Sequence, residues 1–275
     1  MARFAFAVNA FNGSFRNGWL WLIQFLVNPL LFALFTAWLL IPVANTGYLI
    51  LNILFALVLL VASLVLHGGT LNYFSSQGRS EGATLRAAFH CALRNVLAVV
   101  AGVAIVYLLW ALVGKAGSYQ ETFPAYMRSA LPAFLRRQAG LPFFQGLFDA
   151  ALFALRWILI PGLLLPLLAR ASQFGFRGFG REGLTELKQT LFSVSYWGLI
   201  MVAALLGVLA TQKIMGWTPD FRTSTLAEET TSVIFRSFVA YLLGLFAWML
   251  ACSAVGCQGE ELRGAAADPG GQAVG

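Results

Sequence analysis

The sequence predicts an all-α polytopic membrane protein, a transmembrane bundle of about six helices, and three observations support this fold class. Hydrophobic residues make up 59% of the 275 residues and charged residues only 11%, whereas soluble domains are about 45–50% apolar and about 25% charged. The mean hydropathy is +0.77. Apolar stretches long enough to cross a bilayer, about 20 residues each, recur along the chain. So few charges argue against a soluble enzyme, a disordered chain or a nucleic-acid module.

Six stretches have the length of a membrane span. They are roughly 18–41, 47–66, 96–114, 150–169, 194–212 and 233–256. Trp19 and Trp38 lie in the first stretch about 28 Å apart at about 1.5 Å per residue, which is the separation of two interfacial aromatic belts. This stretch exceeds the roughly 7–15 apolar residues of a signal-peptide core, so we expect it to remain as an anchor. A short turn between Pro42 and Gly47 predicts that the first two helices form an antiparallel hairpin.

The distribution of Lys and Arg predicts the orientation of the chain in the membrane. Ten of these residues lie in segments on the side of the two termini, and six lie in loops on the other side. Positive charge is retained on the cytoplasmic side. We therefore expect a multi-pass protein of a bacterial cytoplasmic membrane with both termini in the cytoplasm. The net charge of +7 then indicates contact with anionic lipid headgroups and not with nucleic acid.

An amphipathic segment precedes each odd-numbered span. Phe4, Val8, Phe11 and Phe15 share one helical face before the first span, and leucines at similar spacing do so before the third and fifth. Such helices lie in the interface with basic residues at the headgroups. The candidate headgroup contacts are Arg16, Arg86, His90, Arg94 and Lys188. Alternatively, these helices only brace the helix that follows each of them, or dock a cytoplasmic partner.

The same segments suggest an internal repeat. Ala10-Phe11 and Arg16-Asn17 recur as Ala88-Phe89 and Arg94-Asn95 before the third span. We expect one transmembrane domain, 1–256, built of parallel repeats 1–78, 79–181 and 182–256, followed by a flexible cytoplasmic tail, 257–275. Chance similarity between apolar segments is the alternative explanation.

Two further helical features are expected on the outer side. Apolar and basic residues alternate with helical spacing in the segment 115–148, which predicts an interfacial helix bent near Pro132. Thr225 and Glu228 fit a capping box. The sixth helix is therefore predicted to begin before its membrane-embedded part.

Arg156 is the strongest candidate for a binding residue. It lies inside the fourth apolar stretch, where an arginine at the helix centre costs about 2.5–3.5 kcal/mol to insert. Pro161-Gly162 and Pro166 follow it and invite a kinked or broken helix. A cation beside such a helix suits an anionic headgroup or substrate. The alternative is an arginine that snorkels to the outer interface.

Three weaker candidates are polar residues in the first two spans. Asn28 precedes Pro29 in the middle of the first span, and Asn52 lies early in the second. Both can form hydrogen bonds between helices. His67 ends the second stretch and is either an interfacial hydrogen-bonding residue or a proton relay. Helix packing is the simpler explanation for the two asparagines.

Catalytic motifs are missing from the sequence. It has no Gly-x4-Gly-Lys-Ser/Thr loop, no His-Glu-x-x-His helix and no Gly-x-Ser-x-Gly elbow. With two histidines and three cysteines, a metal centre has few ligands, and Cys91, Cys252 and Cys257 are expected to be free thiols. We predict no catalytic residue, no metal and no cofactor.

These features lead to three functional hypotheses. The first is a non-enzymatic, lipid-facing scaffold or accessory subunit, or a small permease-like unit, whose partners are anionic lipids and a membrane or cytoplasmic protein. The second is a transporter of an anionic amphiphile that uses Arg156. The third, a minor one, is an intramembrane enzyme that modifies lipid-linked substrates.

Overall fold

The computed structural model describes residues 2–42, 45–76, 84–138, 140–217 and 226–267. These residues form helices and no strand, and six helical stretches are long and apolar enough to cross a membrane. The predicted all-α polytopic bundle is therefore confirmed. The bounds of the helices are α1 Ala2–Phe15, α2 Gly18–Leu39, α3 Thr46–Ser76, α4 Leu85–Arg94, α5 Val96–Ala116, η1 Gly117–Tyr119, α6 Thr122–Ala130, α7 Ala133–Gln138, α8 Leu141–Phe153, η2 Ala154–Leu159, α9 Ile160–Phe174, η3 Gly175–Phe179, α10 Arg181–Leu191, α11 Val194–Ala204, η4 Leu205–Ala210, α12 Thr211–Gly216 and α13 Leu226–Ala267.

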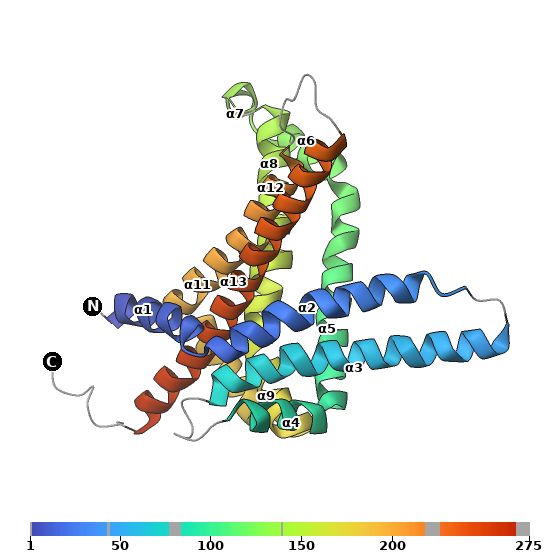
Figure 1. Cartoon of the computed structure of the whole chain (residues 1–275). Coiled ribbons are helices and arrows are strands. Elements are labelled where there is room, and N and C mark those ends of the chain that lie inside the picture. The colour runs from blue at the N-terminus through green and yellow to red at the C-terminus, as the bar shows by residue number, and fades with distance from the viewer. Residues whose placement is uncertain (1, 43–44, 77–83, 139, 218–225, 268–275) are drawn as a thin grey trace.

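Three pairs of spans diverge from a common base. The first pair is α2 and α3, the second is α5 with the continuous α8–η2–α9, and the third is α11–η4–α12 with α13. In Figure 1, α2 and α3 extend to the right, whereas the other two pairs rise toward the top of the view. The short helices α6 and α7 lie at that top end. The α2–α3 hairpin thus projects away from the remaining spans.

The base is the packed core of the molecule. Buried residues concentrate in the C-terminal halves of the second helix of each pair, for example Leu71 in α3, Ala169 in α9 and Met249 in α13. These three helices pack against one another in all three combinations. The N-terminal halves of α3 and α13 stay largely exposed, as Leu54 does at 56% in α3. Apolar side chains of that kind can face lipid at no cost.

Each short helix that precedes a span packs on the second span of a different pair. Helix α1 packs on α13, α4 on α3, and α10 on α9. Glycines permit the close approach, since Gly13 faces Ser253 and Gly69 lies under the ring of Phe89. The predicted positions of the three short helices are correct. They brace mainly spans of other pairs, however, and not chiefly the helix that follows each of them.

Tyrosine hydroxyls satisfy the backbone carbonyls that two prolines leave free. Proline has no N–H, so Pro29 leaves the carbonyl of Phe25 without its helical donor, and Pro166 does the same to Gly162. The hydroxyl of Tyr241 lies 3.2 Å from the Phe25 oxygen. That of Tyr196 donates to the Gly162 oxygen at 2.7 Å. Prolines are therefore tolerated within both spans without a break in the helix.

The fourth span is continuous and contains a π-helical turn. The break invited by Pro161 and Pro166 does not occur, because η2 widens the turn just before Pro161 and the helix resumes as α9. A second π-helical turn, η4, interrupts the fifth span where Gly207 approaches Ala247. No proline in the sequence announces this second turn.

The outer segment and the last helix follow the predictions in part. Helices α6 and α7 are separated at Leu131-Pro132, which confirms a bend at that proline. The described part of helix α13 begins at Leu226. Thr225 lies outside the described residues, so the capping box stays a prediction. Helix α13 also continues to Ala267, past the boundary predicted at 256, because the alanines and charged residues there are good helix formers. Residues 268–275 of the predicted tail are not among those described.

Candidate functional site

Arg156 lies on the π-helical turn η2 and faces α5. Its guanidinium carbon is 4.6 Å from the centre of the Trp110 ring, which is cation–π geometry. Its Nη2 lies so close to Gly114 that a side chain at position 114 would collide with it. The Nε is buried and has no hydrogen-bond partner. One face of the guanidinium is thus used by an aromatic ring, while one donor remains unsatisfied.

The depth of Arg156 follows from its neighbours. Gly114 and Lys115 belong to the last turn of α5, so the guanidinium lies level with the C-terminal end of the third span. The fourth span continues beyond this level through α8, which packs against α6. The position fits an arginine that reaches the interface at this end of the spans while its stem stays in the apolar layer.

Asn28 belongs to a buried polar cluster between α2 and α3. Its amide donates to Gln24 Oε1 at 2.6 Å, and the Gln24 amide donates to Thr70 Oγ1 at 2.5 Å. The Thr70 hydroxyl in turn donates to the Leu66 carbonyl. Gln24 and Thr70 are fully buried. Sequence reasoning missed these two residues, although Gln24 lies one helical turn before Asn28.

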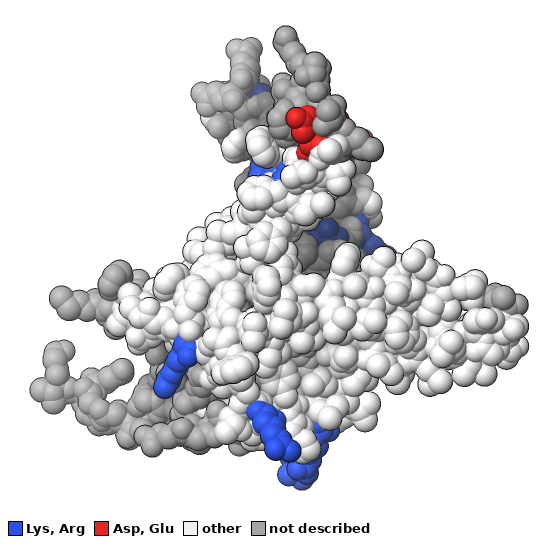
Figure 2. All heavy atoms as spheres, viewed as in Figure 1, with Lys and Arg blue, Asp and Glu red and all other residues white. Residues whose placement is uncertain are grey.

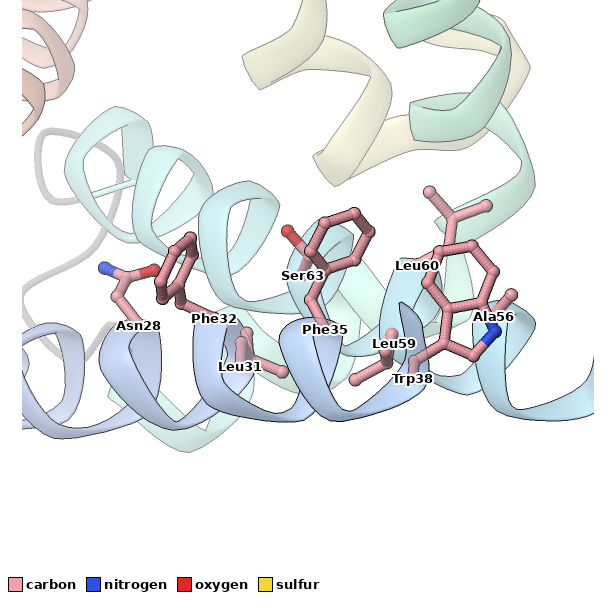
Figure 3. Close-up of a pocket in the computed structure, with 9 residues that line it drawn as sticks. All are labelled: Asn28, Leu31, Phe32, Phe35, Trp38, Ala56, Leu59, Leu60 and Ser63. Atoms are coloured by element: carbon pink, nitrogen blue, oxygen red, sulfur yellow. The ribbon is translucent and has the colours of Figure 1, made fainter. Parts of the chain in front are cut away.

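Asn28 also marks the polar end of an apolar groove on the first hairpin. The groove has a volume of about 480 Å³ and runs between α2 and α3. Figure 3 shows Asn28 at one end, Trp38 toward the other, and Phe32 and Phe35 between them. Its lining residues are Asn28, Leu31, Phe32, Phe35, Trp38, Ala56, Leu59, Leu60 and Ser63.

Asn52 and His67 lie apart from Arg156. Asn52 lines a neighbouring groove on the same hairpin; its carbonyl accepts from the Trp38 indole at 3.0 Å, and its buried Oδ1 has no partner. His67 meets the Trp248 ring edge-on at 5.3 Å between centroids. The grooves lined by Asn28 and Asn52 belong to the first pair of spans, and Arg156 belongs to the second. Asn28 and Asn52 thus line separate grooves, and neither groove includes Arg156 or His67.

The candidate headgroup contacts are all exposed. Arg86, His90 and Arg94 follow one another along the exposed side of α4, while Ala88 and Ala92 on its other side are buried. Arg16 follows α1, and Lys188 lies on α10. Figure 2 shows Lys and Arg side chains gathered at the lower edge of the molecule, over α4, and none on the visible surface of α2 and α3.

No family model, curated protein or solved structure matches this chain. Its function therefore has to be argued from the chain itself. Within the described residues, no group of three or more His, Cys, Asp or Glu side chains is arranged to hold a metal ion. No disulfide joins the cysteines of the described residues.

Proposed function

We propose that the chain is a non-catalytic scaffold or accessory subunit of the bacterial cytoplasmic membrane, with both termini in the cytoplasm. The observation that carries this proposal is the packed base. Tyr196, Leu20 and Met249 are fully buried there, and the buried polar residues Gln24 and Thr70 bond to each other. A base filled in this way supports a structural role more than a passage for a substrate. Six apolar helices place the protein in a membrane.

The proposed architecture is three parallel repeats, 1–78, 79–181 and 182–256. Each short helix packs on the second span of another repeat, and these three equivalent contacts support it, since parallel repeats are expected to make the same contact three times. Two equivalent asparagines add support. Asn17 donates to the hydroxyl of Tyr73 at the end of α3, and Asn95 donates to the carbonyl of Ser172 at the end of α9. In each case the asparagine before the first span of a pair is hydrogen-bonded to the C-terminal end of the second span of the same pair.

The exposed side of α4 is the proposed contact for anionic lipid, with a soluble protein partner as the alternative. Ala88 and Ala92 hold the helix against α3 and leave Arg86, His90 and Arg94 turned outward. Leu93, 49% exposed, and Leu97, 71% exposed, adjoin this basic face. Apolar and basic side chains thus meet along one exposed edge, as they do on interfacial helices.

Reversing two charges of α4 tests this contact. A basic residue near an anionic surface contributes about 1 kcal/mol, so Arg86→Glu with Arg94→Glu is expected to release α4 from anionic lipid. Hydrogen–deuterium exchange of residues 85–94 measures this in nanodiscs with or without phosphatidylglycerol. We expect slower exchange with phosphatidylglycerol for the wild type and no such slowing for the variant. Arg128→Glu with Arg136→Glu, two exposed arginines of the outer segment, is the control.

Equal exchange of the wild-type segment in both lipids would contradict a lipid contact. Slowing that appears only when cytoplasmic extract is added would favour the protein partner.

Transport of an anionic amphiphile is the second candidate. The unpartnered Nε of Arg156 on a π-helical turn favours it, because such a donor can bind an anion. The test is uptake of an anionic amphiphile into vesicles that contain the protein. Uptake by the wild type that is lost in Arg156→Gln would identify this activity.

A further inference from the structure

A second basic feature lies where the fourth span ends, and it differs from the face of α4 because it surrounds a cavity. Arg170 comes from the last turns of α9, Arg177 from η3, and Arg181 from the first residue of α10. All three line one pocket of about 460 Å³, together with Phe174, Gly178 and Gly183. Three successive elements thus bring their guanidinium groups to one place.

Glycines make this convergence possible. Gly175 has φ +63°, a left-handed conformation that ends α9 and reverses the chain. A Cβ at Gly178 would lie 2.5 Å from the carbonyl oxygen of Arg170, and one at Gly183 would collide with the carbonyl of Gly178. The turn therefore folds tightly onto the end of α9 because these positions lack side chains. Arginines that only fix the orientation of loops in the membrane would not need a tight, glycine-dependent turn.

The charge of the pocket is positive. Arg170 donates from Nε to Glu186 and lies 5.5 Å from the centre of the Phe174 ring, so it is held in position and largely neutralised. Arg177 and Arg181 are exposed, and among the described side chains neither has an acidic partner. The stretch 170–188 contains three arginines and one lysine against two glutamates. Two guanidinium groups thus remain for an external anion, and their planar forks suit phosphate oxygens.

We propose that this pocket binds the phosphate of an anionic phospholipid headgroup. An exposed apolar residue that lines it, Phe174, and two that directly adjoin lining residues in the sequence, Phe176 and Leu184, point to a lipid and not to a dissolved ion. Phe174 is 49% exposed, Phe176 63% and Leu184 51%. The pocket also lies at the end of an apolar span, Leu141–Phe179, where headgroups are expected. Acyl chains cover these side chains while Arg177 and Arg181 hold the phosphate. The inference deepens the proposed lipid-contacting function and rests on it.

Removing the two free charges tests the site. The experiment is native mass spectrometry of the full chain in detergent, titrated separately with phosphatidylglycerol, phosphatidylcholine and inorganic phosphate. Since a hydrogen bond to a charged group changes affinity by about tenfold or more, Arg177→Gln with Arg181→Gln is expected to weaken phosphatidylglycerol binding by at least about tenfold. Arg177→Lys with Arg181→Lys, which keeps the charge and loses the fork, is expected to bind with intermediate affinity. Arg128→Gln with Arg136→Gln is the matched control.

The outcomes separate this inference from the role of α4. Loss of phosphatidylglycerol binding in the glutamine variant but not in Arg86→Glu with Arg94→Glu supports the pocket, whatever α4 does. Wild-type affinity in the glutamine variant overturns it. Inorganic phosphate that displaces the lipid at millimolar concentration also overturns the lipid assignment. Equal binding of phosphatidylcholine and phosphatidylglycerol by the wild type has the same consequence.

Discussion

Replacing Gly69 by leucine is expected to lower the stability of the protein by about 1–3 kcal/mol or more, the usual cost of overpacking. A Cβ at this position would lie 2.8 Å from Cδ1 of Phe89, so any side chain there forces α4 away from α3. Thermal unfolding in detergent measures the loss. In the same variant, α4 should exchange its amide hydrogens faster, because its packing on α3 is its main contact.

Gly244 provides a matched control for this prediction. It lies within the last span, and a Cβ there has no atom within 4 Å. Glycine to leucine raises helix propensity by up to about 1 kcal/mol at either position, so the difference between Gly69→Leu and Gly244→Leu isolates packing. Adding Phe89→Ala to Gly69→Leu is expected to restore much of the stability. Equal stability of the two single variants would contradict the close packing of α4 on α3.

Replacing Gly114 by valine is expected to fill the space beside α5 that the guanidinium of Arg156 occupies. A side chain at 114 collides with the guanidinium and displaces it from the end of α5 and from Trp110. The guanidinium is the end of a flexible side chain and can move aside, so the main loss is its cation–π contact with Trp110, worth about 0.5–2 kcal/mol. We therefore expect a modest loss of inserted, folded protein, measured as the fraction that withstands protease digestion in membranes.

Arg156→Leu is expected to rescue the Gly114→Val variant, because the displaced charge is then absent. Gly146→Val is the control, since a Cβ at Gly146 meets no atom within 4 Å. A Gly114→Val protein that inserts as well as the Gly146→Val protein would show that Arg156 does not depend on the outer end of α5.

Hydropathy was sufficient to predict the six spans because lipid exposure requires long apolar stretches. The first span was predicted as 18–41 and is Gly18–Leu39. The sixth was predicted as 233–256, whereas α13 runs from Leu226 to Ala267. Hydropathy reports only the apolar part of a helix, so it cannot locate ends that continue into the polar region. Caps and helix propensity determine those ends.

Contacts between distant segments could not be predicted from one sequence. Arg156 stood out as a charge in an apolar stretch, but its contact with Trp110 depends on how α5 and η2 pack. Gln24 and Thr70 are 46 residues apart and meet only because the first hairpin closes. The π-helical turn at 205–210 has no proline to announce it. Polar residues in a span thus mark candidates, while packing decides their partners.

Six membrane crossings are the central claim, and the first hairpin tests it most directly because it projects away from the other spans (Figure 1). Cys91, Cys252 and Cys257 would be replaced by alanine, and single cysteines placed at the exposed positions Arg16, Leu40, Lys188 and Lys213. A membrane-impermeant maleimide applied to sealed vesicles of each orientation measures which side each position faces. We predict that positions 16 and 188 react only from the cytoplasmic side and positions 40 and 213 only from the opposite side. Labelling of position 40 from the cytoplasmic side would show that α2 and α3 do not cross the bilayer and would contradict the six-span account.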